Sequence, residues 1–344
     1  MKKSIFNFYK TIGSVISVPV GLLIYFVTGK TPSKSYQGLI WLFCISGGRL
    51  NDVISNLIST FQAKCILKSK IGILGDFKDE EKLKSIVEVI KLRGYVVFPE
   101  IVPSEIIERM HSFTSNTKAL KRMMDGQTGS LDLSKEIYKG GVPKAVRYDY
   151  SVDDILDQPD VQDLISDGSI LAIAEKYLNA TPKADVLSMW WHTNFSDKPD
   201  SIAAQYFHFD MDRVKWLKIF IYLTDVDSES GPHSFVEGSH KTNGIPSHLL
   251  RKGYVRLSDE EIEESFTKEK IINFTGKKGT LIIEDTRGLH KGAHVTGNPR
   301  LMLQLQFSNS LFGTNYEKIK IRNIRSESLG KIIGENKEIY REYV

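Results

Sequence analysis

Alternating apolar and polar positions predict several strands in the second half of the chain. Residues 216–223 form a run of aromatic, branched and leucine side chains around a single lysine, and the turn-rich stretch 227–232 follows it. Residues 281–283 (Leu-Ile-Ile) predict another strand, and the aromatic segment 203–210 predicts a third. Such residues favour a pleated, half-buried backbone. We therefore predict that the central part of the chain is mainly β.

The strand predicted over residues 301–307 has two different faces. Because successive side chains of a strand point to opposite sides, Arg300, Met302 and Gln304 share one face with Gln306. The other face carries Leu301, Leu303, Leu305 and Phe307, which suits packing against helices or a second sheet. Short strands with Gly/Pro turns, and no βαβ alternation through 185–310, predict an antiparallel sandwich or jelly roll.

Helical patterns flank this β region on both sides. A helix is predicted over 83–93, ending at Gly94, and a short one near 326–342. Apolar residues also recur at helical spacing closer to the N-terminus, at Leu50, Val53, Ile54, Leu57, Ile58, Phe61 and Cys65. We expect three parts: an N-terminal helical extension (1–82), a β domain (83–313) and a polar, partly helical tail (314–344).

The segment Ile12–Val27 is mostly apolar and follows three lysines, Lys2, Lys3 and Lys10. It contains Pro19, is short for a bilayer span and lacks a small-x-small cleavage site. We predict that it belongs to a helical extension that packs on the β domain or on a partner subunit. The alternative is a peripheral membrane contact through residues 12–27, which would suit a lipid-linked substrate.

Composition excludes several classes of protein. The net charge of +4 over 344 residues comes without Lys/Arg blocks, so nucleic-acid binding is not indicated. Cys44 and Cys65 are the two cysteines and form no Cys-x-x-Cys motif. This predicts neither a zinc cluster nor a disulfide framework and is consistent with a reducing cytoplasm.

The tripeptide His208-Phe209-Asp210 is the main candidate for chemistry. On a strand, residues two apart point to the same side, so His208 and Asp210 would face one point. A third ligand from a distant strand would give two imidazoles and one carboxylate, the set that binds non-haem Fe(II) with open positions. Eight histidines, each with a 42 in 344 chance of an acid two places on, give about one such match by accident. The neighbouring motifs must therefore support the assignment.

Those neighbours resemble one family. The matching pieces are Leu92–Phe98 with the helix after Pro103–Glu105, His208–Asp210, Leu223–Val226 through Gly238–His240, Asp285–His290, and Arg300. In this order and spacing, over roughly residues 86–313, they resemble the phytanoyl-CoA dioxygenase family of Fe(II)- and 2-oxoglutarate-dependent oxygenases. The resemblance implies a double-stranded β-helix, a cupin-like jelly roll, with flanking helices.

The resemblance also implies roles for four residues. His208, Asp210 and His290 correspond to the iron ligands, and Arg300 corresponds to the arginine that holds the distal carboxylate of 2-oxoglutarate. A guanidinium suits that task because its planar fork of donors matches a carboxylate in two parallel bonds. His294 competes with His290 as third ligand, but the ten-residue spacing to Arg300 and the Asp285–Leu289 lead-in favour His290.

Three residues are candidates for further co-substrate contacts. Phe220 falls about where the family has an aromatic that lines the 2-oxoglutarate pocket. Lys218, on the same strand face, would support the co-substrate carboxylate or else lie on the solvent side, because an inward lysine must be paired. Gln304, on the face of Arg300, either touches the co-substrate or bonds at the core edge.

The substrate contacts are the least determined part of the site. Two segments before His208 are candidates to close the mouth of the jelly roll: the stretch 126–150 and residues 190–194. Within them Arg147, Tyr148 and Trp191 are candidates to line a polar pocket; the alternative is a loop that packs its aromatics on the rim. The other histidines are expected to be structural or unremarkable: His111, His192, His233, His240 and His248.

The sequence therefore predicts a cytoplasmic enzyme that uses Fe(II), 2-oxoglutarate and O₂. Hydroxylation of a small organic or lipid-like metabolite is favoured, because halogenating relatives have a small residue where this chain has Asp210. No catalytic residue beyond the metal ligands is required. The alternatives are a jelly-roll module that only binds or senses a ligand, and a cupin-like metalloenzyme that does not use 2-oxoglutarate. Substrate and oligomeric state are not predicted.

Overall fold

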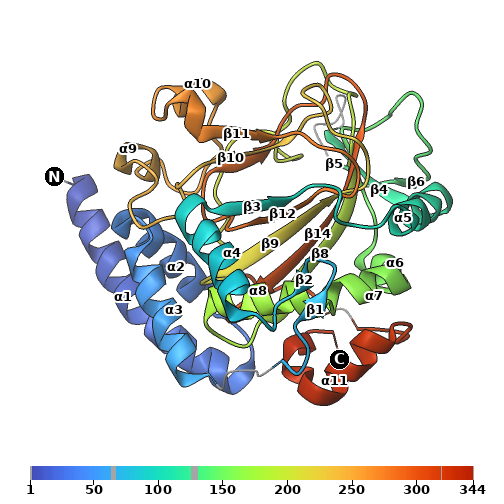
Figure 1. Ribbon diagram of the computed structural model, residues 1–344. Helices are drawn as coiled ribbons and strands as arrows, with labels where there is room; N and C mark the ends of the chain where they lie inside the picture. Colours follow the sequence, from blue (N-terminus) through green and yellow to red (C-terminus); the bar gives the residue numbers. More distant parts are fainter. Residues whose placement is uncertain (1, 63–66, 125–130, 319, 344) are drawn as a thin grey trace.

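A large antiparallel sheet forms the centre of the molecule (Figure 1). The computed structural model describes residues 2–62, 67–124, 131–318 and 320–343. In spatial order the sheet contains β3 (Tyr95–Phe98), β12 (Leu281–Glu284), β9 (Trp216–Tyr222), β14 (Arg300–Ser308), β8 (Lys183–His192), β7 (Arg147–Asp149), β4 (Ala119–Met124) and β5 (Leu131–Asp132), with β6 (Lys135–Glu136) also paired to β4. Cys65 and part of the predicted 126–150 segment lie outside the described residues.

A second, three-stranded sheet completes the barrel. It runs β11 (Ile271–Phe274), β10 (His233–Val236), β13 (His290–Gly292), all antiparallel. Aromatic and aliphatic side chains from both sheets, among them Phe220, Met302, Phe235 and Phe274, form one cluster between them. Two antiparallel sheets facing each other over a shared interior form the predicted double-stranded β-helix.

The register of the large sheet determines which residues face this interior. Met302 of β14 lies opposite Tyr222 of β9 and Trp190 of β8, and all three belong to the inner cluster. The leucines at the alternate positions point outward, as predicted, into a cluster shared with α4 (Glu80–Arg93) and α8 (Gly168–Leu178). Arg300, Gln304 and Lys218 therefore belong to the inner face.

Helices cover the outer face and the ends of the sheet. The helix predicted over 83–93 begins three residues earlier and ends, as predicted, before Gly94, whose φ of 98° is available to glycine at low cost. The others here are α5 (Ser104–Asn116), α6 (Val152–Leu156), α7 (Pro159–Ile165), α9 (Ser247–Leu250), α10 (Asp259–Glu263) and η1 (Lys268–Lys270), and a small hairpin, β1 (Ile71–Gly72) with β2 (Gly75–Asp76), precedes α4.

Three N-terminal helices pack side by side against the β core (Figure 1): α1 (Lys2–Thr28), α2 (Ser33–Ser46) and α3 (Arg49–Phe61). Their buried residues, such as Val18, Leu39 and Ile58, form one cluster with Phe207, Phe209, Met211 and Val214. The ring of Phe43 stacks on that of Phe209 with centroids 5.0 Å apart. The segment that carries the candidate metal ligands therefore rests directly on this helical layer.

The expectation that the N-terminal apolar segment is short was wrong. It is part of a 27-residue helix, in which residues Asn7–Thr28 are long and apolar enough to cross a membrane by length and composition. Only 17% of that apolar stretch is buried inside the fold.

The C-terminal residues also join the main core. α11 (Glu327–Asn336) and η2 (Lys337–Tyr340) fall where a short helix was predicted, and Leu329 and Tyr340 are fully buried against the outer cluster. The division into 1–82, 83–313 and 314–344 remains a prediction, but the hydrophobic packing runs across both of its boundaries.

Candidate metal centre

The segment that carries His208 and Asp210 is extended but does not form the predicted strand. Its pairing is limited to isolated bridges, Phe207 with Leu257 and His208 with His290. The amide of Asp210 donates to the carbonyl of Thr286 at 2.8 Å. Because the pairing changes partner within three residues, no continuous ladder forms. The backbone is still extended enough that His208 and Asp210 point to the same side, as the spacing predicted.

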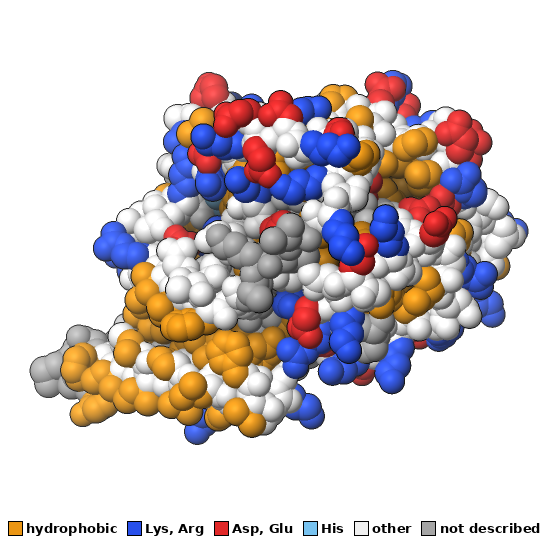
Figure 2. All heavy atoms as spheres, turned by 60° about the horizontal axis from the view of Figure 1, so that its bottom comes forward, with side chains coloured by type: hydrophobic (Ala, Val, Ile, Leu, Met, Phe, Trp, Pro, Cys, Tyr) orange, Lys and Arg blue, Asp and Glu red, His pale blue; other side chains and the backbone are white. Residues whose placement is uncertain are grey.

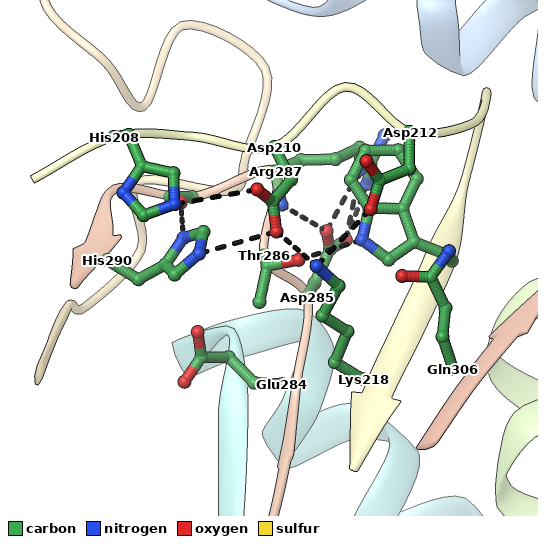
Figure 3. Close-up of polar contacts among 12 residues, drawn as sticks. His208, Asp210, Asp212, Lys218, Glu284, Asp285, Thr286, Arg287, His290 and Gln306 are labelled. Atoms are coloured by element: carbon green, nitrogen blue, oxygen red, sulfur yellow. Dashed lines mark hydrogen bonds and ion pairs between the residues drawn. The ribbon is translucent and has the colours of Figure 1, made fainter. Parts of the chain in front are cut away.

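His208, Asp210 and His290 converge in the interior (Figure 3). Each offers a ligand atom, and these atoms all lie within 4.8 Å of one another. Nε2 of His208 is 3.6 Å from the Asp210 carboxylate, and Nε2 of His290 is 3.3 Å from it. The bridge between residues 208 and 290 joins positions 82 residues apart in sequence, so the fold itself assembles the cluster.

Local hydrogen bonds set the orientation of both imidazoles. Nδ1 of His208 contacts the carbonyl oxygen of Tyr206, and Nδ1 of His290 contacts that of Gly288, each at 3.0 Å. A carbonyl oxygen only accepts, so both Nδ1 atoms carry a proton, and in the neutral form of each ring Nε2 has the lone pair that a metal ion would bind. This is the outer contact that metal-binding histidines commonly make. His294, the alternative third ligand, instead contacts the carbonyl of Ser196 at 2.7 Å.

Lys218 lies against the Asp210 carboxylate on the side away from the histidines (Figure 3). Its buried ammonium donates to Asp210 at 2.5 Å and lies 3.3 Å from Asp212. Burial opposes the charged form of Asp210, but Lys218 and the two histidines hold its pKa well below the usual range. Lys218 therefore faces inward and is paired. Its partners are these two carboxylates. A contact between Lys218 and the co-substrate remains a proposal.

His233 and Glu284 form a second buried pair that the sequence analysis missed. Nε2 of His233 lies 3.0 Å from the Glu284 carboxylate, and the His233 and His290 rings are 5.7 Å apart. Burial, together with the charge of Asp210, raises the pKa of Glu284 to about 8 against the opposing effect of His290. His233 is the first residue of β10. The available signal was Glu284 itself, a carboxylate at the end of an apolar strand.

Arg300 is fully buried on the inner face. It donates to the carbonyl of Gly231 and, at 2.8 Å, to Nδ1 of His192, which is also buried and was not expected to matter. Burial, helped by Arg147, lowers the pKa of Arg300 to about 10. Among the described residues no carboxylate forms an ion pair with Arg300, and its Nε has no hydrogen-bond partner.

The surroundings of Arg300 fit a carboxylate ligand. A buried guanidinium without an anionic partner is costly, so an anion bound there would be stabilised. Gly292, two residues after His290, lies so close that an added Cβ would be 2.9 Å from Nη2 of Arg300. Glycine at this position therefore leaves room for the guanidinium next to the strand that carries His290.

Phe220 and Gln304 occupy neighbouring inner positions. They are register partners on β9 and β14, and the Phe220 ring lies 4.4 Å from that of His233. Both side chains are buried. Phe220 thus lines the interior between the candidate metal ligands and the inner cluster, and a co-substrate contact remains a proposal for both residues.

The predicted pocket of Arg147, Tyr148 and Trp191 is not what the structure shows. Arg147 faces the interior, with its guanidinium 4.3 Å from the Trp190 ring and paired to Asp149 at 2.7 Å. Tyr148 and Trp191 are register partners and point to the outer face, where Tyr148 stacks on Tyr138 in the apolar cluster. Strand alternation separates neighbours in sequence, so Tyr148 cannot share a face with Arg147.

A jelly roll with two histidines and an aspartate converging inside it, and a buried arginine on the same interior, defines a class of mononuclear metal-dependent oxygenases. The chain belongs to the phytanoyl-CoA dioxygenase (PhyH) family, whose model matches residues 90–302. It is an Fe(II)- and 2-oxoglutarate-dependent dioxygenase, and its cofactors are iron, 2-oxoglutarate and O₂.

Solved structures with a similar fold are distant in sequence. HygX from Streptomyces hygroscopicus, with nickel and 2-oxoglutarate bound, is 18% identical over 67% of this chain and 88% of its own, with a TM-score of 0.47. EctD from S. alaskensis with bound Fe is 15% identical over 74% of this chain and 85% of its own, with a TM-score of 0.46. The epimerase SnoN from nogalamycin biosynthesis is 17% identical over 67% of this chain and 84% of its own, with a TM-score of 0.42. A search of curated proteins finds no match.

Proposed function

We propose that this protein hydroxylates a C–H bond of a small organic or lipid-like metabolite. His208, Asp210 and His290 would hold Fe(II), and Arg300 would hold the distal carboxylate of 2-oxoglutarate. The observation that carries this proposal is the convergence of two Nε2 atoms and one carboxylate within 4.8 Å, on the same interior as a buried guanidinium without an anionic partner. Bound Fe(II) and 2-oxoglutarate supply O₂ activation coupled to oxidative decarboxylation.

The chain's own residues would prepare the site for that chemistry. The carbonyls of Tyr206 and Gly288 keep both Nε2 lone pairs directed at the ion. The ammonium of Lys218 donates to Asp210 Oδ2 and keeps that carboxylate ionised, so that it would be able to hold a cation. Burial of all three candidate ligands excludes bulk water. No side chain needs to act as a general base.

The donor set favours hydroxylation over halogenation. A carboxylate at residue 210 fills the position that halogenating relatives leave to halide, so halogenation is disfavoured. The similar structures include an epimerase and a carbocyclase, which are named for other outcomes. Product analysis by mass spectrometry would distinguish them, because hydroxylation adds one oxygen atom to the substrate.

The first test needs no knowledge of the substrate. Purified protein loaded anaerobically with Fe(II) should develop a weak visible absorption band when 2-oxoglutarate is added, and should slowly release succinate in air. A His290→Ala variant should show neither. Absence of the band in folded, iron-loaded protein would refute the proposed function.

Two rival functions make different predictions. A module that only binds or senses a ligand would form the band but release no succinate. A cupin-like metalloenzyme that does not use 2-oxoglutarate would keep its activity in an Arg300→Ala variant. The buried, anion-free guanidinium of Arg300 favours the 2-oxoglutarate enzyme over the second rival.

We further propose that the reaction takes place in the cytoplasm, on a small-molecule substrate and without nucleic acid. Reduced iron and 2-oxoglutarate are available there, and Cys44 is a free thiol. A membrane contact through residues 12–27 is part of this proposal, because it would bring the enzyme to amphiphilic substrates.

A further inference from the structure

The outer face of α1 is an unbroken apolar stripe. Figure 2 shows hydrophobic side chains gathered along this helix, with few charged ones among them. Their exposed fractions range from 42% for Ile12 to 87% for Val27. The stripe, defined here as the exposed apolar residues of α1, contains Phe8, Tyr9, Ile12, Val15, Ile16, Val20, Leu23, Ile24, Phe26 and Val27. Spacings of three and four residues place these side chains along one side of the helix.

The opposite face of α1 is held firmly by the rest of the fold. Ser35 of α2 donates to the carbonyl of Ser17 at 2.7 Å, and Trp41 of α2 donates to Thr11 at 3.1 Å. Near the other end of α1, the Tyr25 hydroxyl accepts from the amide of Leu311 at 3.2 Å. Contacts therefore lie along most of the helix, and leaving the fold to cross a bilayer would break them. The stripe is exposed while α1 stays docked.

Charge identifies the partner. Residues 1–50 contain six basic residues and no acidic residue, a charge of +6, whereas the whole chain has +4, so residues 51–344 carry −2. Lys10 lies near one end of the stripe, and Lys30 and Lys34 follow its other end. A second copy of the chain would bring like charges together at this face. An anionic lipid surface would attract them, and exposed apolar area between basic residues is typical of in-plane membrane helices.

We propose that the α1 stripe inserts into one leaflet of an anionic membrane, with the helix lying in the plane of the interface and still packed on α2. This membrane proposal rests on the proposed function in one respect only: membrane binding would give the enzyme access to an amphiphilic substrate. α2 links the surface to the site, since Phe43 stacks on Phe209 between His208 and Asp210. A docked protein would thus hold its candidate metal segment one helical layer from the lipid.

The first experiment measures flotation of the purified full-length protein with lipid vesicles. It should float with vesicles of phosphatidylcholine and phosphatidylglycerol and much less with phosphatidylcholine alone. The double variant Ile16→Glu, Leu23→Glu should lose binding by about tenfold or more, because charged side chains enter the apolar interface at high cost. The matched control is the double variant Ile324→Glu, Leu92→Glu, which places the same two charges at side chains that are 54% and 65% exposed elsewhere.

Each other outcome would overturn the proposal. Equal flotation of the double variant would exclude the stripe as the contact. A wild-type dimer that the double variant dissociates, without lipid binding, would identify a second copy as the partner. If the intact mass of the protein isolated from cells corresponds to loss of residues 1–28, that segment is a cleaved leader.

Topology distinguishes in-plane insertion from a span. The single-cysteine variants Asn7→Cys and Lys30→Cys, each in a Cys44→Ser, Cys65→Ser background, should react with an impermeant maleimide from the same side of native membranes. Reaction from opposite sides would show a span and overturn the proposal. Because the stripe contacts none of the candidate metal ligands, the double variant should keep wild-type succinate release in solution. Loss of lipid binding with this release intact separates the membrane proposal from the proposed function.

Discussion

Lys218 and a bound metal ion would compete for the same negative charge. The ammonium lies between Asp210 and Asp212 and is buried with them. In a Lys218→Met variant both carboxylates would lose their cation. We expect the metal-free variant to lose about 3–5 kcal/mol of unfolding free energy, the usual result of breaking a buried pair.

Metal should restore much of that loss. Addition of Mn(II), a redox-stable substitute for Fe(II), should raise the melting temperature of Lys218→Met more than that of the wild type, as measured by thermal unfolding. Lys183→Met is the control, because its ion pair with Glu338 is remote from the candidate ligands. An equal gain in all three proteins would mean that Lys218 does not share the charge of Asp210 with the metal.

Arg300 should determine affinity for 2-oxoglutarate but not for metal. Arg300→Lys keeps the charge and loses the planar fork, so the apparent Kd for 2-oxoglutarate should rise about tenfold or more. Titration of the visible band under anaerobic conditions measures this. Mn(II) affinity should stay unchanged, which also shows that the variant is folded. Arg109→Lys, in an ion pair with Asp160, should change neither value.

Single residues on long strands could be oriented from the sequence because strand alternation is local. Arg300 and Gln304 lie on the predicted side, and Lys218 faces inward, which was one of the two alternatives that the sequence left open. His192, His233 and Glu284 could not be assigned, because their importance depends on which strands are neighbours. Register between distant strands is a property of the folded sheet and leaves no mark on one strand alone.

At the scale of elements, the contact between α2 and the candidate metal segment couples two parts of the molecule. The Phe43 and Phe209 rings stack with centroids 5.0 Å apart, and both are buried. Phe43→Ala should cost about 3–5 kcal/mol in a urea unfolding experiment, because it leaves a cavity beside this segment.

The same variant should also bind Mn(II) more weakly, since His208 and Asp210 flank Phe209. Phe61→Ala on α3, where the side chain is 83% exposed, is the control and should change neither quantity. A destabilised Phe43→Ala protein with wild-type metal affinity would show that the helical layer supports the fold alone.

The contact of Lys215 with α8 should make stability depend on pH. Its ammonium lies 4.5 Å from the centre of the Tyr177 ring, and burial, followed by Arg287, lowers its pKa from 10.5 to about 8. Between these two values the unfolded chain binds more protons, so the unfolding free energy should rise with pH across that window.

Lys215→Met removes this proton linkage. The stability of the variant relative to the wild type should be greatest below about pH 8 and should decline toward pH 10.5. Urea titrations of both proteins at several pH values measure the difference between their unfolding free energies. The titration of other groups affects both proteins alike and cancels in this difference. A difference that does not vary with pH would contradict the depressed pKa of Lys215.

Long elements were predictable, and irregular ones were not. The helix before Gly94 and the strands at 216–223 and 301–307 have strong periodicity and end at glycine or polar turns. The segment 203–210 has a strand-like composition, yet its backbone partner changes from Leu257 to His290 to Thr286. Those partners come from loops and strands far along the chain, so composition gave no sign of them.

At the scale of the whole molecule, the N-terminal helices are part of one core. Their apolar residues share a cluster with Phe207 and Met211, and Asp52 of α3 pairs with Arg287 at 2.8 Å. Deletion of residues 1–61 would expose this cluster to water. We expect the truncated protein to be insoluble or to unfold without cooperativity, as followed by circular dichroism.

The double variant Ile16→Glu, Leu23→Glu is the control, because it alters only the exposed side of α1 and should stay soluble and cooperative. A soluble, cooperatively folding truncation would show that residues 62–344 are independent of the helices. The sequence predicted a helical extension, but not that it would pack on the candidate metal segment. That arrangement depends on three-dimensional packing of parts more than 150 residues apart.

The bridge between His208 and His290 has a consequence for the order of assembly. Two of the three candidate ligands become neighbours only when segments 82 residues apart have met, and their imidazole rings are oriented by their own local backbone. No short stretch of the nascent chain can therefore capture the ion early and guide folding around it. Iron would enter a finished protein, and under iron starvation the cell would accumulate a folded apoenzyme that regains activity as soon as metal returns.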